Sequence, residues 1–230
     1  MSLNQTARRA APLLLLALVG CQAVNPGVAQ LDRYQQARDA GQWQAIADDA
    51  PTNKCQPVVE GCARLYGIYG EANQHLAFAS LAPNAFCPPP VANGRLNTAA
   101  ASFAKSEQFG DASLSAEAKS RLQNLHAQAL YCLAENASSI EQGTALVRQS
   151  AAQAAALPRP DALFWQAMSQ LYLARPGAGS DAQRCAAARS ASDAARAARS
   201  AGVTGEQSQT LGRVSHDAEQ LRRLIAGCAE

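Results

Sequence analysis

The chain has 230 residues, of which 48% are hydrophobic and 17% are charged, and its formal net charge is +2. This length suits one helical domain of ordinary size or two small ones. So small a net charge does not supply the basic field that nucleic-acid binding requires, and it gives no strong attraction to anionic lipid headgroups. We therefore expect no nucleic-acid partner.

Residues 1–21 have the pattern of a secretory signal peptide. Arg8 and Arg9 precede the apolar residues 12–18, and the stretch ends in Leu18-Val19-Gly20-Cys21. A basic start, a short apolar segment and small residues at the end are typical of such peptides. The apolar run is too short for a permanent span, which needs about 20 residues. An ordinary signal peptide would end in an Ala-x-Ala-like site, which Leu18-Val19-Gly20 matches poorly.

The ending resembles the lipobox of bacterial lipoproteins. The resemblance implies that residues 1–20 are removed and that the thiol and new amino group of Cys21 are acylated. Removal takes away Arg8 and Arg9 and no acid, which leaves 20 − 2 = 18 basic residues against 18 acidic ones. Membrane contact would then come from the acyl chains, because two or three chains together anchor stably. By the sorting rule of enterobacterial members, Gln22 implies the outer membrane, with the protein facing the periplasm.

Residues 21–30 contain Pro-Gly and lack periodicity, so we expect them to tether the lipid to the fold. Residues 31–230 are expected to form one all-helical periplasmic domain, because Ala is abundant and no stretch alternates with period two. The first predicted helices are 31–40 and 42–49 with a break at Gly41, then 58–81, 96–109 with a turn at Gly110, and 115–135.

In the predicted helix 58–81, four apolar residues lie on roughly one face, namely Leu65, Ile68, Tyr69 and Leu76. Gly67 and Gly70 in the same segment indicate either a close approach of another helix or a break.

Three later helices begin at sequences that fit a capping box, in which two side chains bond the free backbone N–H groups of the first turn. These sequences are Ser138…Glu141, Ser180…Gln183 and Thr204…Gln207. They predict helices at 140–157, 182–201 and 205–226, with a further helix at 160–175 between prolines. Helices of this length joined by short loops are typical of an array of antiparallel hairpins.

Trp165-x2-Met168-Ser169-x2-Tyr172 resembles the first-helix spacing of tetratricopeptide repeats. Ala145 and Ala152 resemble the two Ala positions of the second helix in that family. The stretch around Gly41 and Trp43 resembles its inter-helix turn, with a spacing one residue short. The resemblance implies stacked hairpins with a concave groove that binds peptides or partner helices. It also implies that Trp165, Met168, Ser169 and Tyr172 pack between helices, and we expect them to form core rather than a ligand cage.

Six cysteines follow Cys21, and an even number in an exported protein predicts disulfides. Residues that face one another in an antiparallel helix pair are equidistant from the turn. Cys87 and Cys132 are centred on the Gly110 turn, which makes the required Cα separation of about 5.5 Å reachable. We therefore expect this pair to form.

Cys185 and Cys228 are centred close to the turn at 202–205, which favours a second pair. Cys55 and Cys62 remain as the third pair, because Pro57 between them indicates a non-helical loop. The alternatives for these thiols are metal binding and catalysis, which the absence of Cys-x2-Cys spacing disfavours.

For the other candidate residues, the sequence context favours a structural role. His75, His126 and His216 are far apart in sequence. Gly177-Ala178-Gly179-Ser180-Asp181 follows a helix instead of a strand, so we interpret it as a turn with an N-cap. No Gly-x-Ser-x-Gly, His-Glu-x2-His or phosphate-binding Gly loop occurs, and we expect no metal and no cofactor.

Three glutamates are acid–base candidates, since glycosidases need two carboxylates. They are Glu117, Glu135 and Glu141, and we expect all three on solvated helix faces. Four arginines also form a possible basic stripe, which we interpret as a solvated face because Asp193 is spaced for ion pairs with two of them. The four are Arg184, Arg189, Arg196 and Arg199.

The sequence thus predicts an outer-membrane lipoprotein that acts as an interaction scaffold or assembly factor in the cell envelope, in pilus, secretion, outer-membrane or wall machinery. Its partner would be another envelope protein. This rests on fold-level analogy, which does not fix function. The alternatives are a periplasmic enzyme that acts on cell-wall glycan and a small-ligand binder.

Overall fold

The computed structural model describes residues 26–51, 61–83, 85–110 and 114–228, and all regular secondary structure within them is helical. This confirms the predicted all-α class. The α-helices are α1 (Pro26–Asp39), α2 (Trp43–Asp48), α3 (Cys62–Phe78), α4 (Asn93–Phe109), α5 (Ala116–Glu135), α6 (Ile140–Ala154), α7 (Arg159–Leu173), α8 (Asp181–Ser200) and α9 (Gly205–Leu224). A short 3₁₀ helix, η1 (Pro90–Ala92), leads into α4.

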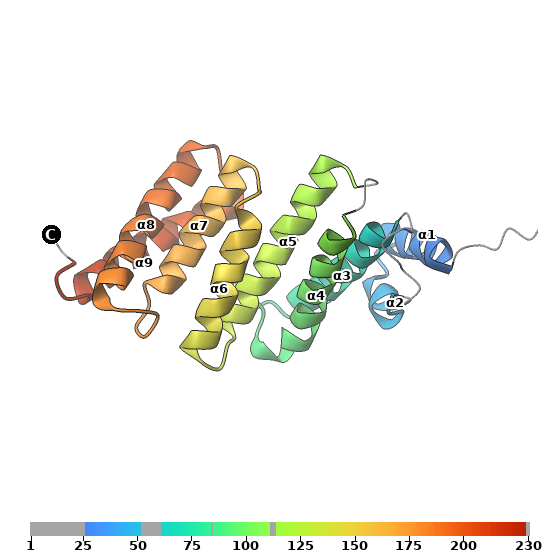
Figure 1. Cartoon of the computed structure of the whole chain (residues 1–230), viewed down its shortest axis with the longest axis horizontal. Helices are drawn as coiled ribbons and strands as arrows, with labels where there is room; N and C mark the ends of the chain where they lie inside the picture. The colour runs from blue at the N-terminus through green and yellow to red at the C-terminus, as the bar shows by residue number, and fades with distance from the viewer. Residues whose placement is uncertain (1–25, 52–60, 84, 111–113, 229–230) are drawn as a thin grey trace, which may run out of the picture.

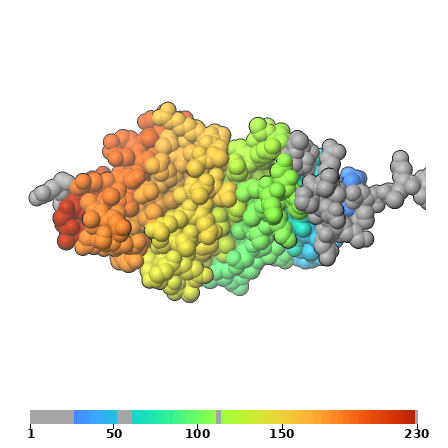
Figure 2. Space-filling model, viewed as in Figure 1, coloured from blue at the N-terminus to red at the C-terminus, as the bar shows by residue number. Residues whose placement is uncertain are grey.

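The helices form an elongated array with α1 at one end and α9 at the other (Figure 1). The pairs α3/α4, α5/α6 and α7/α8 pack closely, and each second helix also packs against the first helix of the next pair. The first helices α3, α5, α7 and α9 also contact one another in succession. On the face shown in Figure 2, residues follow the order of the chain along the long axis.

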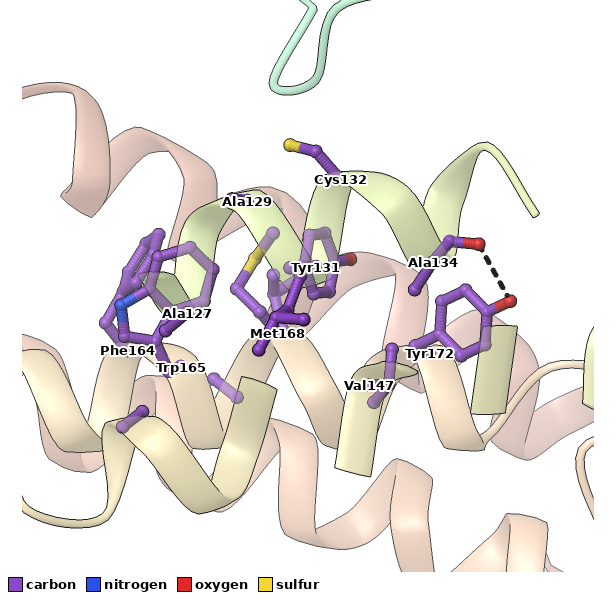
Figure 3. Close-up of a cluster of buried hydrophobic side chains, with 14 of the residues drawn as sticks. Ala127, Ala129, Tyr131, Cys132, Ala134, Val147, Phe164, Trp165, Met168 and Tyr172 are labelled. Atoms are coloured by element: carbon purple, nitrogen blue, oxygen red, sulfur yellow. Dashed lines mark hydrogen bonds between the residues drawn. The ribbon is translucent and has the colours of Figure 1, made fainter. Parts of the chain in front are cut away.

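The main apolar core lies mostly among α5 to α9 and extends to Leu96 and Ala100 of α4 and Ala77 of α3. In Figure 3, Trp165, Met168 and Tyr172 of α7 lie beside Ala127, Tyr131 and other residues of α5. Much of this core is alanine, including Ala191, Ala194, Ala195 and Ala198 of α8. Such small side chains let helix backbones approach closely, and the aromatic residues of α7 supply the bulk that fills the space between them.

A second, smaller core joins α1, α2 and α3. All four residues predicted to share one face of α3 belong to it: Leu65 and Ile68 are buried, and Tyr69 and Leu76 are partly buried. Gly67 and Gly70 mark a close approach and not a break, because α3 is continuous through both. A Cβ atom at Gly70 would lie 2.6 Å from the Phe103 ring of α4.

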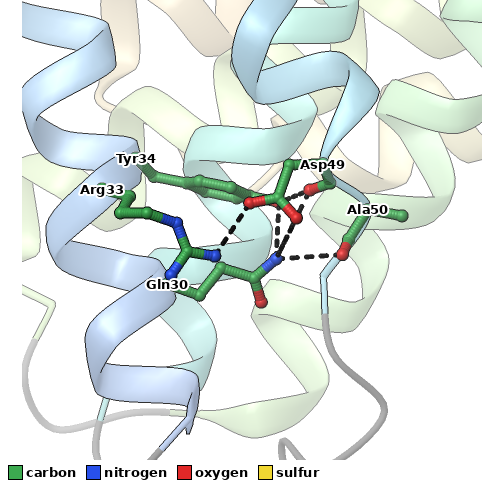
Figure 4. Close-up of polar contacts among 5 residues, drawn as sticks. All are labelled: Gln30, Arg33, Tyr34, Asp49 and Ala50. Carbon is green, nitrogen blue, oxygen red and sulfur yellow. Dashed lines mark hydrogen bonds and ion pairs between the residues drawn. The ribbon is translucent and has the colours of Figure 1, made fainter.

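Helix α1 starts earlier than predicted, so residues 26–30 are helical and do not belong to a tether. Pro26 is its first residue, where a missing N–H costs no hydrogen bond and the fixed φ suits a helix. Figure 4 shows side chains of α1 that meet the chain just after α2. Gln30 donates to the carbonyl of Ala50 at 3.0 Å, Arg33 pairs with Asp49 at 3.1 Å, and the Tyr34 hydroxyl donates to the Asp49 carbonyl.

The three helix starts predicted from capping boxes agree with the structure to within one residue, whereas α3 and α4 begin at Cys62 and Asn93 instead of at 58 and 96. Only one of the three capping boxes is confirmed. Ser180 and Gln183 form it in full. Before α6 the cap is Ser139 instead of Ser138, since the Ser139 hydroxyl accepts from the Gln142 N–H at 3.2 Å. Thr204 is the N-cap of α9, and its side chain makes no cap hydrogen bond.

Two disulfides join the pairs that the sequence predicts. Cys87 bonds to Cys132 with a Cα separation of 5.2 Å, and Cys185 bonds to Cys228 with 5.5 Å. Cys62 is also disulfide-bonded, and its predicted partner, Cys55, lies outside the described residues.

None of the helices within the described residues has a stretch long and apolar enough to cross a membrane. Cys21 and the signal-like residues 1–20 lie outside the described part of the chain.

Candidate functional site

A cleft of about 490 Å³ lies between the segment after α3 and the first helices of the later pairs. One wall is formed by Leu81, Ala82, Pro83, Ala85 and Phe86, and α5, α7 and α9 form the others. We call this space the main cleft. Every helix that lines it is one of those that contact one another in succession along the array.

The inner surface of the main cleft is aromatic. Phe86, Phe164 and Trp165 all line it, and Tyr131 of α5 packs behind them. The Phe164 and Trp165 ring centroids are 5.2 Å apart, and each lies 6.0 Å from that of Phe86. Phe86 precedes Cys87, so the Cys87–Cys132 disulfide ties this wall of the cleft to α5.

The rim of the main cleft is polar and rich in amide side chains. Asn124 and Gln128 come from α5, and Gln207 and Gln209 come from α9. The indole Nε1 of Trp165 donates to Asn124 Oδ1 at 2.6 Å, which fixes the position of one amide. An amide carries both donors and an acceptor, so this rim matches groups of either kind.

A second pocket of about 250 Å³ lies between α2, α3 and α5. Gln128 lines both this pocket and the main cleft, and its Oε1 accepts from Gln74 Nε2 at 2.9 Å. Trp43 and His75 stand on another side of the pocket with ring centroids 4.7 Å apart.

The second pocket holds a buried carboxylate. Glu71 is 8% exposed, and its Oε1 lies 2.9 Å from the guanidinium of Arg121. Burial raises the pKa of the Glu71 carboxyl, and the nearby charges of Arg121 and Arg38 oppose that rise only in part. The other oxygen, Oε2, and Oε1 of Gln74 are buried and have no hydrogen-bond partner in the described part of the chain.

The repeat-like residues are all buried. Trp165, Met168, Ser169 and Tyr172 belong to the core side of α7, as expected. The Tyr172 hydroxyl donates to the Ala134 carbonyl at 3.2 Å. Trp165 is 2% exposed, in keeping with the expected core role, and it also contributes to the lining of the main cleft.

The predicted Ala positions of the preceding helix are wrong, because Ala145 and Ala152 are exposed. The small residues on the buried face of α6 include Gly143, Ser150 and Ala154. Ser150 donates to the Ala127 carbonyl at 2.8 Å, and a Cβ at Gly143 would overlap the Tyr172 hydroxyl. The buried face of α6 is set by contact with Tyr172 and α5, which the Ala spacing did not indicate.

The three histidines have separate surroundings. His126 is buried and its Nδ1 lies 3.0 Å from Glu107 Oε1, whereas His216 interacts with Gln220 on α9. His75 lies in the second pocket. Within the described residues no group of three or more His, Cys, Asp or Glu side chains is arranged to hold a metal ion.

Of the glutamates considered, Glu117 and Glu141 are exposed as expected. Glu135 departs from the expectation, because it is half-buried and bonded on two sides. Its carboxylate accepts from the Arg175 guanidinium at 2.7 Å and from the Tyr131 hydroxyl at 2.7 Å. These bonds tie α5 to the end of α7, so the carboxylate is fully engaged in structure.

The predicted arginine stripe divides into separate contacts. Arg184 is mostly buried and pairs with Asp181 at 2.9 Å, and Arg189 donates to the Cys228 carbonyl at 3.2 Å. Arg196 makes an expected pair with Asp193 at 3.9 Å, while Arg199 reaches Ser215 on α9. Arg184, Arg189 and Arg199 therefore connect α8 to neighbouring segments through Ala174, Cys228 and Ser215, whereas Arg196 is solvated as expected.

Neither pocket was identified from the sequence. Of the polar residues that line the two pockets, Glu71 carried a signal of burial in the sequence. It follows Ile68 by three residues, so it lies on the predicted apolar face of its helix. Phe86, Gln128 and Gln209 are brought together by packing of segments far apart in the chain, and no local pattern marks them.

The chain matches no protein-family model, and searches among curated proteins and among solved structures each found no match.

Proposed function

We propose that this protein is a lipid-anchored scaffold of the bacterial envelope that binds an extended segment of a partner polypeptide in the main cleft. The observation that carries the proposal is the combination of an aromatic inner surface with an amide-rich rim along α5, α7 and α9. Amide side chains pair with both the N–H and the C=O groups of a polypeptide backbone, and apolar side chains pack on the aromatic surface that lines the cleft.

Charge within the main cleft is consistent with a polypeptide partner. Glu206 and Arg213 of α9 stand on the same rim with opposite signs. A rim without an excess of positive charge does not suit a nucleic-acid backbone. Specificity would then come from shape and from hydrogen bonds.

A tetratricopeptide-like stack is part of this proposal. Its support is that each first helix contacts its own second helix and the next first helix, and that the large residues of α7 pack as the repeat resemblance implies. In such a stack the first helices line one surface, and both pockets are lined chiefly by them.

An envelope location is proposed from two features. One is the basic and apolar pattern of residues 1–21 that ends in Cys21. The other is the pair of disulfides, since disulfides persist mainly in oxidising compartments. Acyl chains on Cys21 would hold the protein at the membrane.

The interaction can be tested by site-specific photocrosslinking in intact envelopes. A benzophenone side chain is placed at Gln209 or Gln128 in the main cleft, and at Gln149 on the exposed face of α6 as the matched control. We expect the adducts from the two cleft positions to map to one continuous segment of one partner protein. The control position Gln149 should give no adduct with that segment. Equally abundant adducts from Gln149 would exclude the main cleft as the binding site. Glycan-hydrolysing activity of the pure protein would support the enzyme alternative.

The anchor is tested separately with Cys21→Ser. We expect this variant to appear in the soluble fraction or to remain unprocessed, because the acylated thiol is gone. Wild-type chain measured in parallel should fractionate with the outer membrane. A variant that is processed and still sediments with that membrane would contradict the lipid anchor.

A further inference from the structure

The second pocket contains two buried acceptors that no group among the described residues satisfies. Glu71 Oε2 and Gln74 Oε1 are both inaccessible and have no hydrogen-bond partner. They lie three residues apart on α3, so the two side chains stand on the same face of the helix. Buried acceptors without donors destabilise a fold, and native proteins keep few of them. Two on one turn of a pocket wall indicate a ligand that brings N–H groups.

The charge of Glu71 favours a cationic ligand. The carboxylate is bonded on one side only, by Arg121, whose own side chain is 60% exposed. Its second oxygen therefore faces no compensating charge within bonding distance. A guanidinium or ammonium group supplies the missing charge together with several donors.

The remaining walls of the second pocket suit the carbon chain that carries such a group. Trp43 and His75 present ring surfaces, and Phe78 and Leu125 are apolar. Aromatic faces attract cations, and the methylene stem of a basic side chain packs well on apolar walls. A volume of about 250 Å³ fits one long side chain and excludes a folded element.

We propose that the second pocket binds a guanidinium or primary ammonium group at the end of an aliphatic chain, with Glu71 Oε2 and Gln74 Oε1 as its acceptors. This inference rests on the pocket's own geometry and not on the proposed function. Because Gln128 joins the two pockets, the group can come from a basic side chain of a polypeptide in the main cleft. A free polyamine would offer the same chemistry.

The test is calorimetric titration of the full chain with three probes at neutral pH. They are the blocked tripeptide acetyl-Ala-Arg-Ala-amide, the same peptide with citrulline in place of arginine, and spermidine. We expect saturable binding of at least one cationic probe, at least tenfold tighter than that of the neutral citrulline peptide. Tighter binding of the arginine peptide identifies a polypeptide source, and tighter binding of spermidine identifies a free polyamine. If citrulline binds as well as both cations, or if neither cation saturates, the proposal is wrong.

Two variants locate the site. Glu71→Gln keeps the shape of the side chain and removes its charge, so we expect at least a tenfold loss of affinity for the cationic probe. Since the wild-type carboxylate is buried with an unsatisfied oxygen, this variant is expected to stay folded, which thermal unfolding measured in parallel will verify. Glu117→Gln on the exposed surface of α5 is the matched control and should leave affinity unchanged. Unchanged affinity in folded Glu71→Gln would overturn the proposal, whatever the photocrosslinking experiment gives.

Discussion

Gly70 decides how closely α3 and α4 approach. A Cβ atom there would meet the Phe103 ring at 2.6 Å, and Phe103 is fully buried. We expect Gly70→Ala to lower the free energy of unfolding by about 1–3 kcal/mol, because overpacking a core strains its neighbours. Gly212→Ala, at a helix-interior glycine with open space around it, should instead stabilise by about 0.5–1 kcal/mol. Urea unfolding of both variants checks this, and equal effects would contradict the close approach.

The burial of Glu71 predicts how the stability of the fold depends on pH. Burial raises the pKa of its carboxyl above the usual 4.5, so the folded chain holds this proton at pH values where the unfolded chain has released it. Stability therefore falls as pH rises from about the unfolded pKa through the folded one. We expect Glu71→Gln to gain stability relative to wild type over that window and to keep a constant difference above it. Unfolding curves measured from pH 4 to pH 8, a range of about four units around this window, check the sign.

The helix caps show how local sequence acts on whole elements. Ser180 bonds the first turn of α8 and receives the reciprocal bond from Gln183, while Thr204 makes no side-chain bond at α9. We expect Ser180→Ala to lower the free energy of unfolding by about 1 kcal/mol, the usual value of an N-cap. Thr204→Ala should cost clearly less. Chemical denaturation of the two variants side by side makes the comparison, and equal losses would refute it.

The boundary of α1 also belongs to the scale of elements. Residues 26–30 carry no helical periodicity, and they are helical because Gln30 reaches Asp49 and Ala50 beyond α2. Those partners lie some twenty residues away, so a tether was the natural expectation from the sequence. The packing of α1 onto α2 and α3, through Leu31, Tyr34 and Ile46, then holds the helix in place.

At the scale of the whole molecule, the Cys87–Cys132 and Cys185–Cys228 disulfides restrain loops of nearly equal length at different places. They span 45 and 43 residues, so removal of either is expected to cost about 2–4 kcal/mol through the unfolded state. Only the pair Cys87→Ser and Cys132→Ser should also disturb the main cleft, because Phe86 precedes Cys87 and packs on Trp165.

That difference is measurable by fluorescence. In a Trp43→Phe background, Trp165 is the remaining tryptophan of the chain. We expect its emission in the native state to shift when Cys87 and Cys132 are replaced, and to stay unchanged when Cys185 and Cys228 are replaced. A shift of the same size in both variants would show that the disulfide does not hold the aromatic wall.

The helical class, the turns at Gly41 and Gly110 and the pairing of four cysteines followed from the sequence by itself. These features depend on local propensity, on turn residues and on distance along the chain, which the sequence states directly. Tertiary structure decided the rest: the cap at Ser139, the burial of Gly143 instead of Ala145, and both pockets. Those depend on which side chains meet across helices, and such contacts are selected by packing of segments that the sequence places far apart.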